Sequence, residues 1–225
     1  MTADGAARDA ALRNLVERAL GWADEHDGIM PIVAAGDPVL RTPADTFDGQ
    51  LEDALLCRLI DSMRATMKAA PGVGLAAPQV GIPLRLAVLE DSAPVDPDVA
   101  LARERTPLPF RVIVNPSYTA IGAREASFYE GCLSVPGYQA VVNRSAAIRL
   151  QGFDERGEVL DEEVTGWPAR IVAHETDHLD GILYLDRAET RSLATHQAVA
   201  GLWDQPSPEH AAGALGFRLG SGRRG

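Results

Sequence analysis

The chain has 225 residues, of which 46% are hydrophobic and 24% charged, a composition typical of a globular protein with one substantial domain. Its formal net charge of -11, with Lys68 as the single lysine, excludes non-specific nucleic-acid binding, because neutralising phosphates requires clustered Lys and Arg. No apolar segment approaches the roughly 18 to 20 residues that cross a bilayer, and acidic residues interrupt the N-terminal segment, so we expect a cytoplasmic protein without membrane contact.

Two helices are predicted in the first third of the chain. Residues 5–26 carry an amphipathic pattern typical of a helix packed on the domain surface. Its apolar stripe consists of Leu12, Leu15, Val16, Ala19 and Leu20. A second helix is predicted from about residue 50 to 69, and Cys57 falls within its apolar pattern, which indicates a core side chain.

The following segments favour short strands rather than long helices. Runs typical of strands occupy residues 84–89, 111–115, 140–144, 146–153 and 159–164. The sequence FDERGEVL predicts a hairpin turn between the last two, whereas residues 90–109 are rich in Pro and Asp and predict a surface loop. A final helix is predicted over residues 187–203, followed by a mobile tail over residues 205–225.

The sequence AHETDHLDG, residues 173–181, has the spacing of a metal site on a helix. His174 and His178 lie four positions apart, so a helix stacks both imidazoles on one face, where they can bind one divalent ion. Glu175 lies about 100° around the helix, within reach of a water on the metal without being a ligand. Pro168 suits the first turn of this helix and Gly181 the position after its end. A surface helix that carries two histidines by chance is the alternative.

A third ligand is needed, because a catalytic metal usually has three protein ligands and one open position. Cys132, within EGCLSVPG at residues 130–137, offers a thiolate. A structural zinc site would require a fourth ligand, and no second Cys or suitably spaced His is near Cys132 in the sequence. This shortage favours a catalytic site.

The sequence GVGLAAPQVG, residues 72–81, contains small residues that allow the backbone to approach a ligand closely. Gln79 is its only polar side chain. The segment lacks the lysine of a phosphate-binding loop, so a nucleotide site is not indicated. Taken alone, it is equally compatible with a tight turn that enters a strand.

In this order and at these separations, the three sequences closely resemble the signature motifs of the peptide deformylases, metalloenzymes that remove formate from the N-formylmethionine of new polypeptides. The sequence GDPVLRTPA, residues 36–44, is similar to the usual beginning of that family, so the resemblance covers roughly residues 31–190. It implies an α+β fold in which small antiparallel and mixed sheets pack around a central H-E-x-x-H helix. Residues 1–30 would form a helical extension, 31–190 the catalytic domain, and 191–225 a C-terminal helix with a mobile tail.

Carried over residue by residue, the resemblance implies a role for each residue of the motifs. The implied metal ligands are Cys132, His174 and His178. Glu175 would accept a proton from water and later protonate the departing amine, while Gln79 and the backbone N–H of Leu133 would hold the formyl oxygen.

The resemblance also implies which residues contact the substrate. The backbone of Gly74 would line the substrate. The implied methionine pocket consists of Val73, Phe128, Trp167 and Ile171. Glu130 and Arg144 match charged residues of the family, for which a substrate role and a structural ion pair both stay open. Ala173 departs from the glutamine that many members carry there, but it has no catalytic role.

The implied cofactor is one divalent metal ion. A thiolate ligand donates more charge than a carboxylate and suits softer metals, in agreement with the Fe(II) preference usual in the family. The sequence does not distinguish iron from zinc, nickel or cobalt. The implied partners are N-formylmethionyl nascent peptides, with a transient contact to the ribosome.

Two other functions fit parts of the sequence. A metallopeptidase shares the H-E-x-x-H motif, but it ordinarily uses a third His or a Glu as ligand instead of a loop cysteine such as Cys132. A non-catalytic metal-binding protein would not need Glu175 or Gln79, and both are present. The residues therefore favour the deformylase hypothesis.

Overall fold

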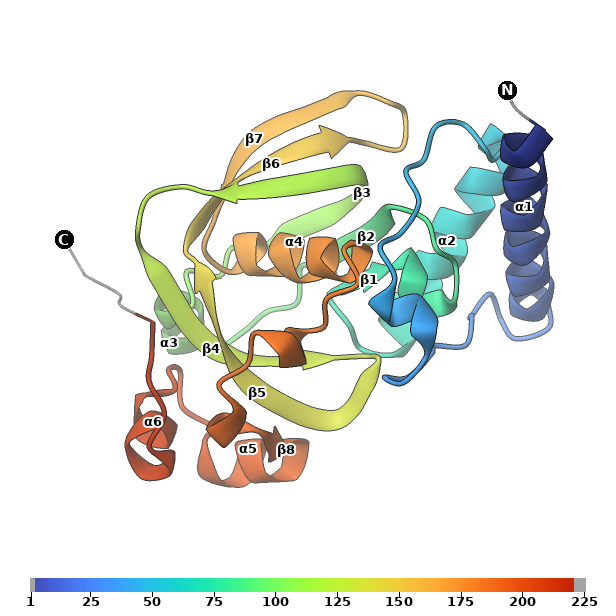
Figure 1. The fold of residues 1–225 in the computed structure, drawn as a ribbon. Helices are drawn as coiled ribbons and strands as arrows, with labels where there is room; N and C mark the ends of the chain where they lie inside the picture. Colours follow the sequence, from blue (N-terminus) through green and yellow to red (C-terminus); the bar gives the residue numbers. More distant parts are fainter. Residues whose placement is uncertain (1–2, 221–225) are drawn as a thin grey trace.

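Two antiparallel sheets and one central helix form the fold of this computed structural model, which describes residues 3–220 (Figure 1). The larger sheet has the strand order β1-β2-β3-β6-β7. Its strands are β1 (Gly74–Ala76), β2 (Leu86–Asp91), β3 (Leu108–Ala120), β6 (Ala147–Phe153) and β7 (Val159–Thr165). The smaller sheet has the order β4-β5-β8. Its strands are β4 (Glu125–Cys132), β5 (Val135–Ser145) and β8 (Ala194–Thr195).

Helix α4 (Gly166–Leu179) lies between the sheets and contacts strands of both (Figure 1). The expected α+β fold is confirmed. Every strand pair within the two sheets is antiparallel, and parallel pairing in the described residues is confined to an isolated bridge between Asp45 and Leu84.

The ends and the apolar face of α4 follow from its sequence. Pro168 lies in the first turn, and Gly181 follows the helix with a positive φ of 74°. Ile171, Val172 and Leu179 are buried against side chains of the larger sheet. The predicted helix and its two boundary residues are therefore present, with the polar residues of the motif on the remaining faces.

Helices α1 (Ala3–Asp24) and α2 (Asp53–Ala69) pack on each other at one side of the molecule (Figure 1). Val16 and Leu20 of α1 are buried with Leu59 and Met63 of α2 in one apolar cluster. The prediction that Cys57 is a core residue is wrong, because its side chain is exposed. The apolar pattern around it is real, but Cys57 lies just beside the buried stripe.

The segment between β2 and β3 is more ordered than a plain loop. Helix α3 (Pro97–Ala102) lies within the predicted loop of residues 90–109. The side chain of Asp96 caps it by accepting hydrogen bonds from the backbone N–H groups of Asp98 and Val99. A short helix of this kind leaves no long apolar pattern, which explains why the sequence did not reveal it.

The C-terminal region also differs from expectation. Residues 187–203 form the 3-10 turn Thr190–Ser192, strand β8 and helix α5 (His196–Leu202) instead of one helix. Helix α6 (Glu209–Leu215) follows, and Ala211 and Phe217 are buried against Val141. The tail therefore contains a helix that the sequence did not predict, its mobility stays a prediction, and residues 221–225 lie outside the described part.

Three shorter 3-10 helices complete the architecture, and one of them reaches the candidate site. They are η1 (Pro38–Arg41), η2 (Ala77–Val80) and η3 (Tyr184–Asp186). Helix η2 follows β1 directly and contacts α4. None of the helices in residues 3–220 is long and apolar enough to cross a lipid bilayer.

Candidate metal centre and substrate cavity

Cys132, His174 and His178 come together where the end of β4 meets α4. Their candidate ligand atoms all lie within 4.8 Å of one another. The Sγ atom of Cys132 is 3.2 Å from Nε2 of His178, and the two imidazole centroids are 5.0 Å apart. One thiolate and two imidazoles in this arrangement fit a single divalent transition-metal ion, with room for a further ligand.

The ring of His174 is held by Glu130. Its Nδ1 atom lies 2.9 Å from Oε2 of Glu130, so Nδ1 can donate to the carboxylate and Nε2 is left for a metal. Glu130 is buried, and the guanidinium group of Arg144 donates to it at 2.7 and 3.0 Å. Burial opposes ionisation, but Arg144, His174 and Arg170 outweigh it and hold the pKa of Glu130 well below its ordinary value.

The charged network continues from Arg144 towards the surface. Arg144 donates to Asp177 at 2.7 Å, and Asp177 also accepts from Arg187 and from the hydroxyl of Tyr118. Asp177 is buried, whereas Arg187 is partly exposed. Because the side-chain hydrogen bonds of Arg144 described here all go to Glu130 and Asp177, its geometry is that of a structural ion pair.

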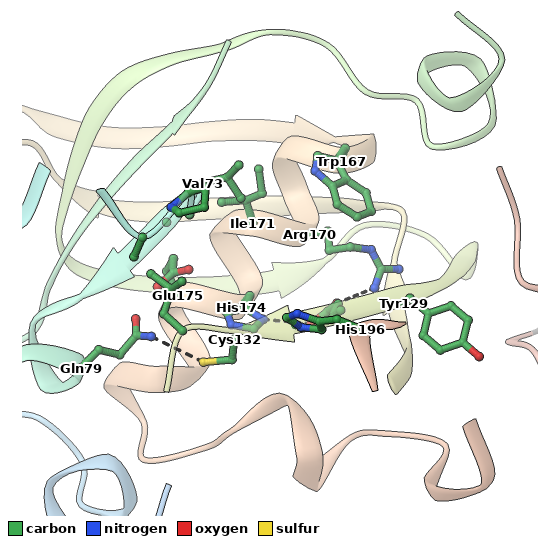
Figure 2. Close-up of a pocket in the computed structure, with 17 residues that line it drawn as sticks. Val73, Gln79, Tyr129, Cys132, Trp167, Arg170, Ile171, His174, Glu175 and His196 are labelled. Atoms are coloured by element: carbon green, nitrogen blue, oxygen red, sulfur yellow. Dashed lines mark hydrogen bonds and ion pairs between the residues drawn. The ribbon is translucent and has the colours of Figure 1, made fainter. Parts of the chain in front are cut away.

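Gln79 of η2 points its amide nitrogen at the metal centre (Figure 2). Its Oε1 atom accepts a hydrogen bond of 2.8 Å from the backbone N–H of Ala76, which sets the orientation of the amide. Nε2 then donates to Sγ of Cys132 at 3.5 Å and to Oγ of Ser134 at 3.4 Å. The side chain is buried and held at both ends.

Glu175 lies beside the same centre, on the side that faces β1 (Figure 2). A Cβ atom at Gly74 would overlap the Glu175 carboxylate, so only glycine leaves room for it. Oε2 of Glu175 is buried without a hydrogen-bond partner among the described residues. Burial raises the pKa of Glu175 to about 7, against the opposing effects of His174 and Arg144.

A cavity of about 330 Å³ opens onto these residues. The predicted site residues that line it are Val73, Gly74, Gln79, Glu130, Cys132, Leu133, Trp167, Ile171, His174 and Glu175. Phe128 lies elsewhere, on the lining of a second cavity of about 40 Å³. Trp167 and Arg170 line both cavities. Arg144 is buried in the ion-pair network described above.

Arg170, Tyr129 and His196 are among the lining residues that did not emerge from the sequence. Arg170 donates to Glu130 and to the carbonyl oxygens of Val142 and Ala126, and its position four residues before His174 would have placed it on the ligand face of the helix. Tyr129 and His196 form part of the cavity lining (Figure 2). His196 lies far from every motif, so no local pattern could have indicated it.

Comparisons with known proteins agree with this geometry. The family model described as polypeptide deformylase matches residues 29–193. Peptide deformylase 3 of Streptomyces avermitilis is 65% identical over 192 residues, which cover 85% of this chain and 86% of that protein. Peptide deformylase 1 of Streptomyces coelicolor is 64% identical over 192 residues, 85% of this chain and 88% of that protein.

Solved structures give the same result. A class I type b peptide deformylase from Acinetobacter baumannii with bound Met-Ala-Ser has 34% sequence identity and a TM-score of 0.64. The match covers 71% of this chain and 98% of that chain. One cavity joins the Cys-His-His centre to a buried glutamate, and relatives of this similarity match most of the chain. This chain therefore belongs to the peptide deformylase family, the hydrolases that remove the N-formyl group from newly made polypeptides.

Proposed function

We propose that this chain hydrolyses the formyl amide of N-formylmethionyl peptides at the centre formed by Cys132, His174 and His178. The observation that carries the proposal is that Cys132 and His174 line one cavity with Glu175 and Gln79, and that the ligand atom of His178 lies within 4.8 Å of theirs. A divalent ion bound there would polarise the formyl oxygen and lower the pKa of a bound water. Fe(II) is the proposed ion, in agreement with the preference usual in the family and with a ligand set of one thiolate and two imidazoles, and Zn(II), Ni(II) and Co(II) are the alternatives.

Glu175 is the proposed proton carrier. Its buried carboxylate has one oxygen without a partner, so it can accept a proton from the attacking water. Water adds to the formyl carbon, the carbon–nitrogen bond breaks, and the same carboxyl group delivers the proton to the departing amine. The products are formate and a peptide with a free methionine amino group.

Gln79 and the backbone N–H of Leu133 are the proposed donors to the oxygen that gains charge during attack. The hydrogen bond from Ala76 holds the Gln79 amide with its nitrogen towards the metal centre, so the donor already faces the place where negative charge develops. Leu133 follows the proposed ligand Cys132 and also lines the cavity. Donors fixed in this way stabilise a developing oxyanion more than mobile water does.

The methionine side chain is proposed to bind between Val73, Trp167 and Ile171. These apolar side chains line the cavity beside the metal centre, and the backbone of Gly74 lies next to Val73. The volume of the cavity, about 330 Å³, is in the range expected for a small-ligand site. The relative from Acinetobacter baumannii was solved with Met-Ala-Ser, the peptide that would remain after formyl-Met-Ala-Ser is hydrolysed.

The substrates are proposed to be N-formylmethionyl nascent peptides, with a transient contact to the ribosome while they emerge. The direct test is to incubate anaerobically purified protein with formyl-Met-Ala-Ser and to measure formate. Acetyl-Met-Ala-Ser is the matched control, because its extra methyl group adds bulk at the reacting carbon. Metal-loaded protein that releases no formate from the formyl peptide would overturn the proposal.

A further inference from the structure

The segment between β2 and β3 reaches the wall of the substrate cavity through Arg103. The Cζ atom of Arg103 lies 5.0 Å from the ring centroid of Trp167 and 5.8 Å from that of Phe128. Its Nε atom is buried without a hydrogen-bond partner among the described residues. The guanidinium group is therefore packed on aromatic faces, a contact in which an arginine cation is attracted to the ring electrons.

The backbone next to Arg103 is fastened to the beginning of α4. The N–H of Trp167 donates to the carbonyl oxygen of Glu104 at 3.3 Å, and the Glu104 carboxylate accepts from both terminal nitrogens of Arg124 at 2.6 and 2.8 Å. Gly166 has a φ of +63°, and a Cβ atom there would overlap the Glu104 carbonyl oxygen. This close approach places Arg103 at a defined position relative to Trp167.

Trp167 and Arg170 line both the substrate cavity and the second cavity, whereas Arg103 and Phe128 line only the second. Arg170 contacts the Trp167 ring from its own side, with Cζ 5.8 Å from the centroid, so Arg103 supports the ring on the side of the second cavity. Phe128 meets Trp167 edge to face, with ring centroids 5.9 Å apart. If the guanidinium group were absent, Trp167 could move into the space it vacates, and the substrate cavity would widen on this side.

We propose that Arg103 is a positioning residue that holds Trp167 as a wall of the methionine pocket and so limits the size of the first side chain accepted. This inference rests on the proposed function, in particular on methionine binding against Trp167. Arg103 belongs neither to the metal centre nor to the lining of the substrate cavity, so its removal changes the shape of the pocket without removing a reacting group.

The test compares kcat and KM for formyl-Met-Ala-Ser and formyl-Phe-Ala-Ser. Arg103→Ala should raise KM for the methionine peptide about three- to ten-fold, because Trp167 is no longer held against the methionine side chain, with kcat nearly unchanged. The Phe-to-Met ratio of kcat/KM should rise, because the widened cavity admits the larger ring. Arg103→Lys, which keeps the charge but not the planar group, should lie between wild type and Arg103→Ala.

Arg149→Ala is the matched control, because Arg149 pairs with the exposed Asp161 on the sheet surface. Its kinetic constants should equal those of the wild type. In a Trp167→Ala background, Arg103→Ala should have no further effect on KM or on the Phe-to-Met ratio, since the residue acts through the ring.

The inference would be overturned if Arg103→Ala had the wild-type Phe-to-Met ratio of kcat/KM. It would also be overturned if Arg103→Ala changed KM equally in the wild-type and Trp167→Ala backgrounds. If Arg103→Ala does not fold, Arg103→Lys decides in the same way, because a wild-type ratio in that variant contradicts the proposed wall. Absence of formate release by the wild-type protein would instead contradict the proposed function, so the two failures are distinguishable.

Discussion

Glu175 combines burial, a close glycine neighbour and an unpartnered oxygen beside the candidate ligands. We predict that Glu175→Gln retains its metal but loses about 100-fold or more in kcat, because a neutral amide cannot accept the proton of water. Formate release and metal content per chain are the measurements. Glu163→Gln, an exposed change on β7, is the control and should leave both unchanged. Nearly wild-type turnover in Glu175→Gln would exclude its role in proton transfer.

Glu130 has a different place in the site, because it bonds two arginines as well as His174. We predict that Glu130→Gln lowers the free energy of unfolding by about 3 kcal/mol or more, since Arg144 and Arg170 lose their shared buried counter-charge. It should also weaken metal binding about ten-fold or more, because the ring of His174 is no longer held by a carboxylate.

Denaturant titration and metal content after dialysis measure these two effects of Glu130→Gln. Glu163→Gln again serves as the control for loss of one negative charge. If the variant kept its stability and metal but showed a higher KM, Glu130 would have the substrate role that the sequence left open. Stability and metal content on one side, and KM on the other, therefore distinguish a structural role of Glu130 from a substrate-binding role.

At the scale of elements, Glu90 ties β2 to α2 through Arg64 at 2.8 Å and Lys68 at 3.1 Å. The hydrogen bond from Arg64, with smaller contributions from Lys68, lowers the pKa of Glu90 below its ordinary value of 4.5. The unfolded chain therefore binds the proton more tightly, so this contribution to stability is present above pH 4.5 and is lost as the pH falls through the folded-state pKa.

We predict that Glu90→Gln is less stable than the wild type near neutral pH and that the difference shrinks as the pH falls below the ordinary pKa of the carboxyl group. Urea denaturation of both proteins across this range is the measurement. Comparing them cancels the effects of the other carboxylates, which titrate in both. A difference that stays constant down to about pH 3 would show that the ion pairs do not stabilise the fold.

Elements with local signals were predictable from the sequence, and those that depend on distant partners were not. Helix α4 shows the first case, since the His spacing, Pro168 and Gly181 all lie within its own sequence. Helix α6 shows the second, because the burial of Ala211 and Phe217 against Val141 depends on contacts about 70 residues apart in the chain. The site divides in the same way. Its motif residues could be recognised locally, whereas His196 reaches the cavity only through the folded C-terminal segment.

At the scale of the whole molecule, the candidate site joins separate parts of the fold. Cys132 comes from the smaller sheet and His174 from the central helix, while Gln79 follows the first strand of the larger sheet. None of these residues would be held near the others in an unfolded chain. A metal ion that binds the three proposed ligands should therefore stabilise the native state as a unit.

We predict that removing the metal with a chelator lowers Tm, and that restoring Fe(II), Zn(II) or Ni(II) raises it again. At a free metal concentration about 1,000 times Kd, linkage gives a stabilisation of about 4 kcal/mol. Calorimetry on metal-free and reloaded protein under anaerobic conditions is the measurement. Cys132→Ala should lose most of this response, because only two histidines remain as ligands, whereas Cys57→Ser, which changes the exposed thiol, should respond as the wild type does. An equal Tm with and without metal in the wild type, or an undiminished response in Cys132→Ala, would show that these three residues do not hold the ion.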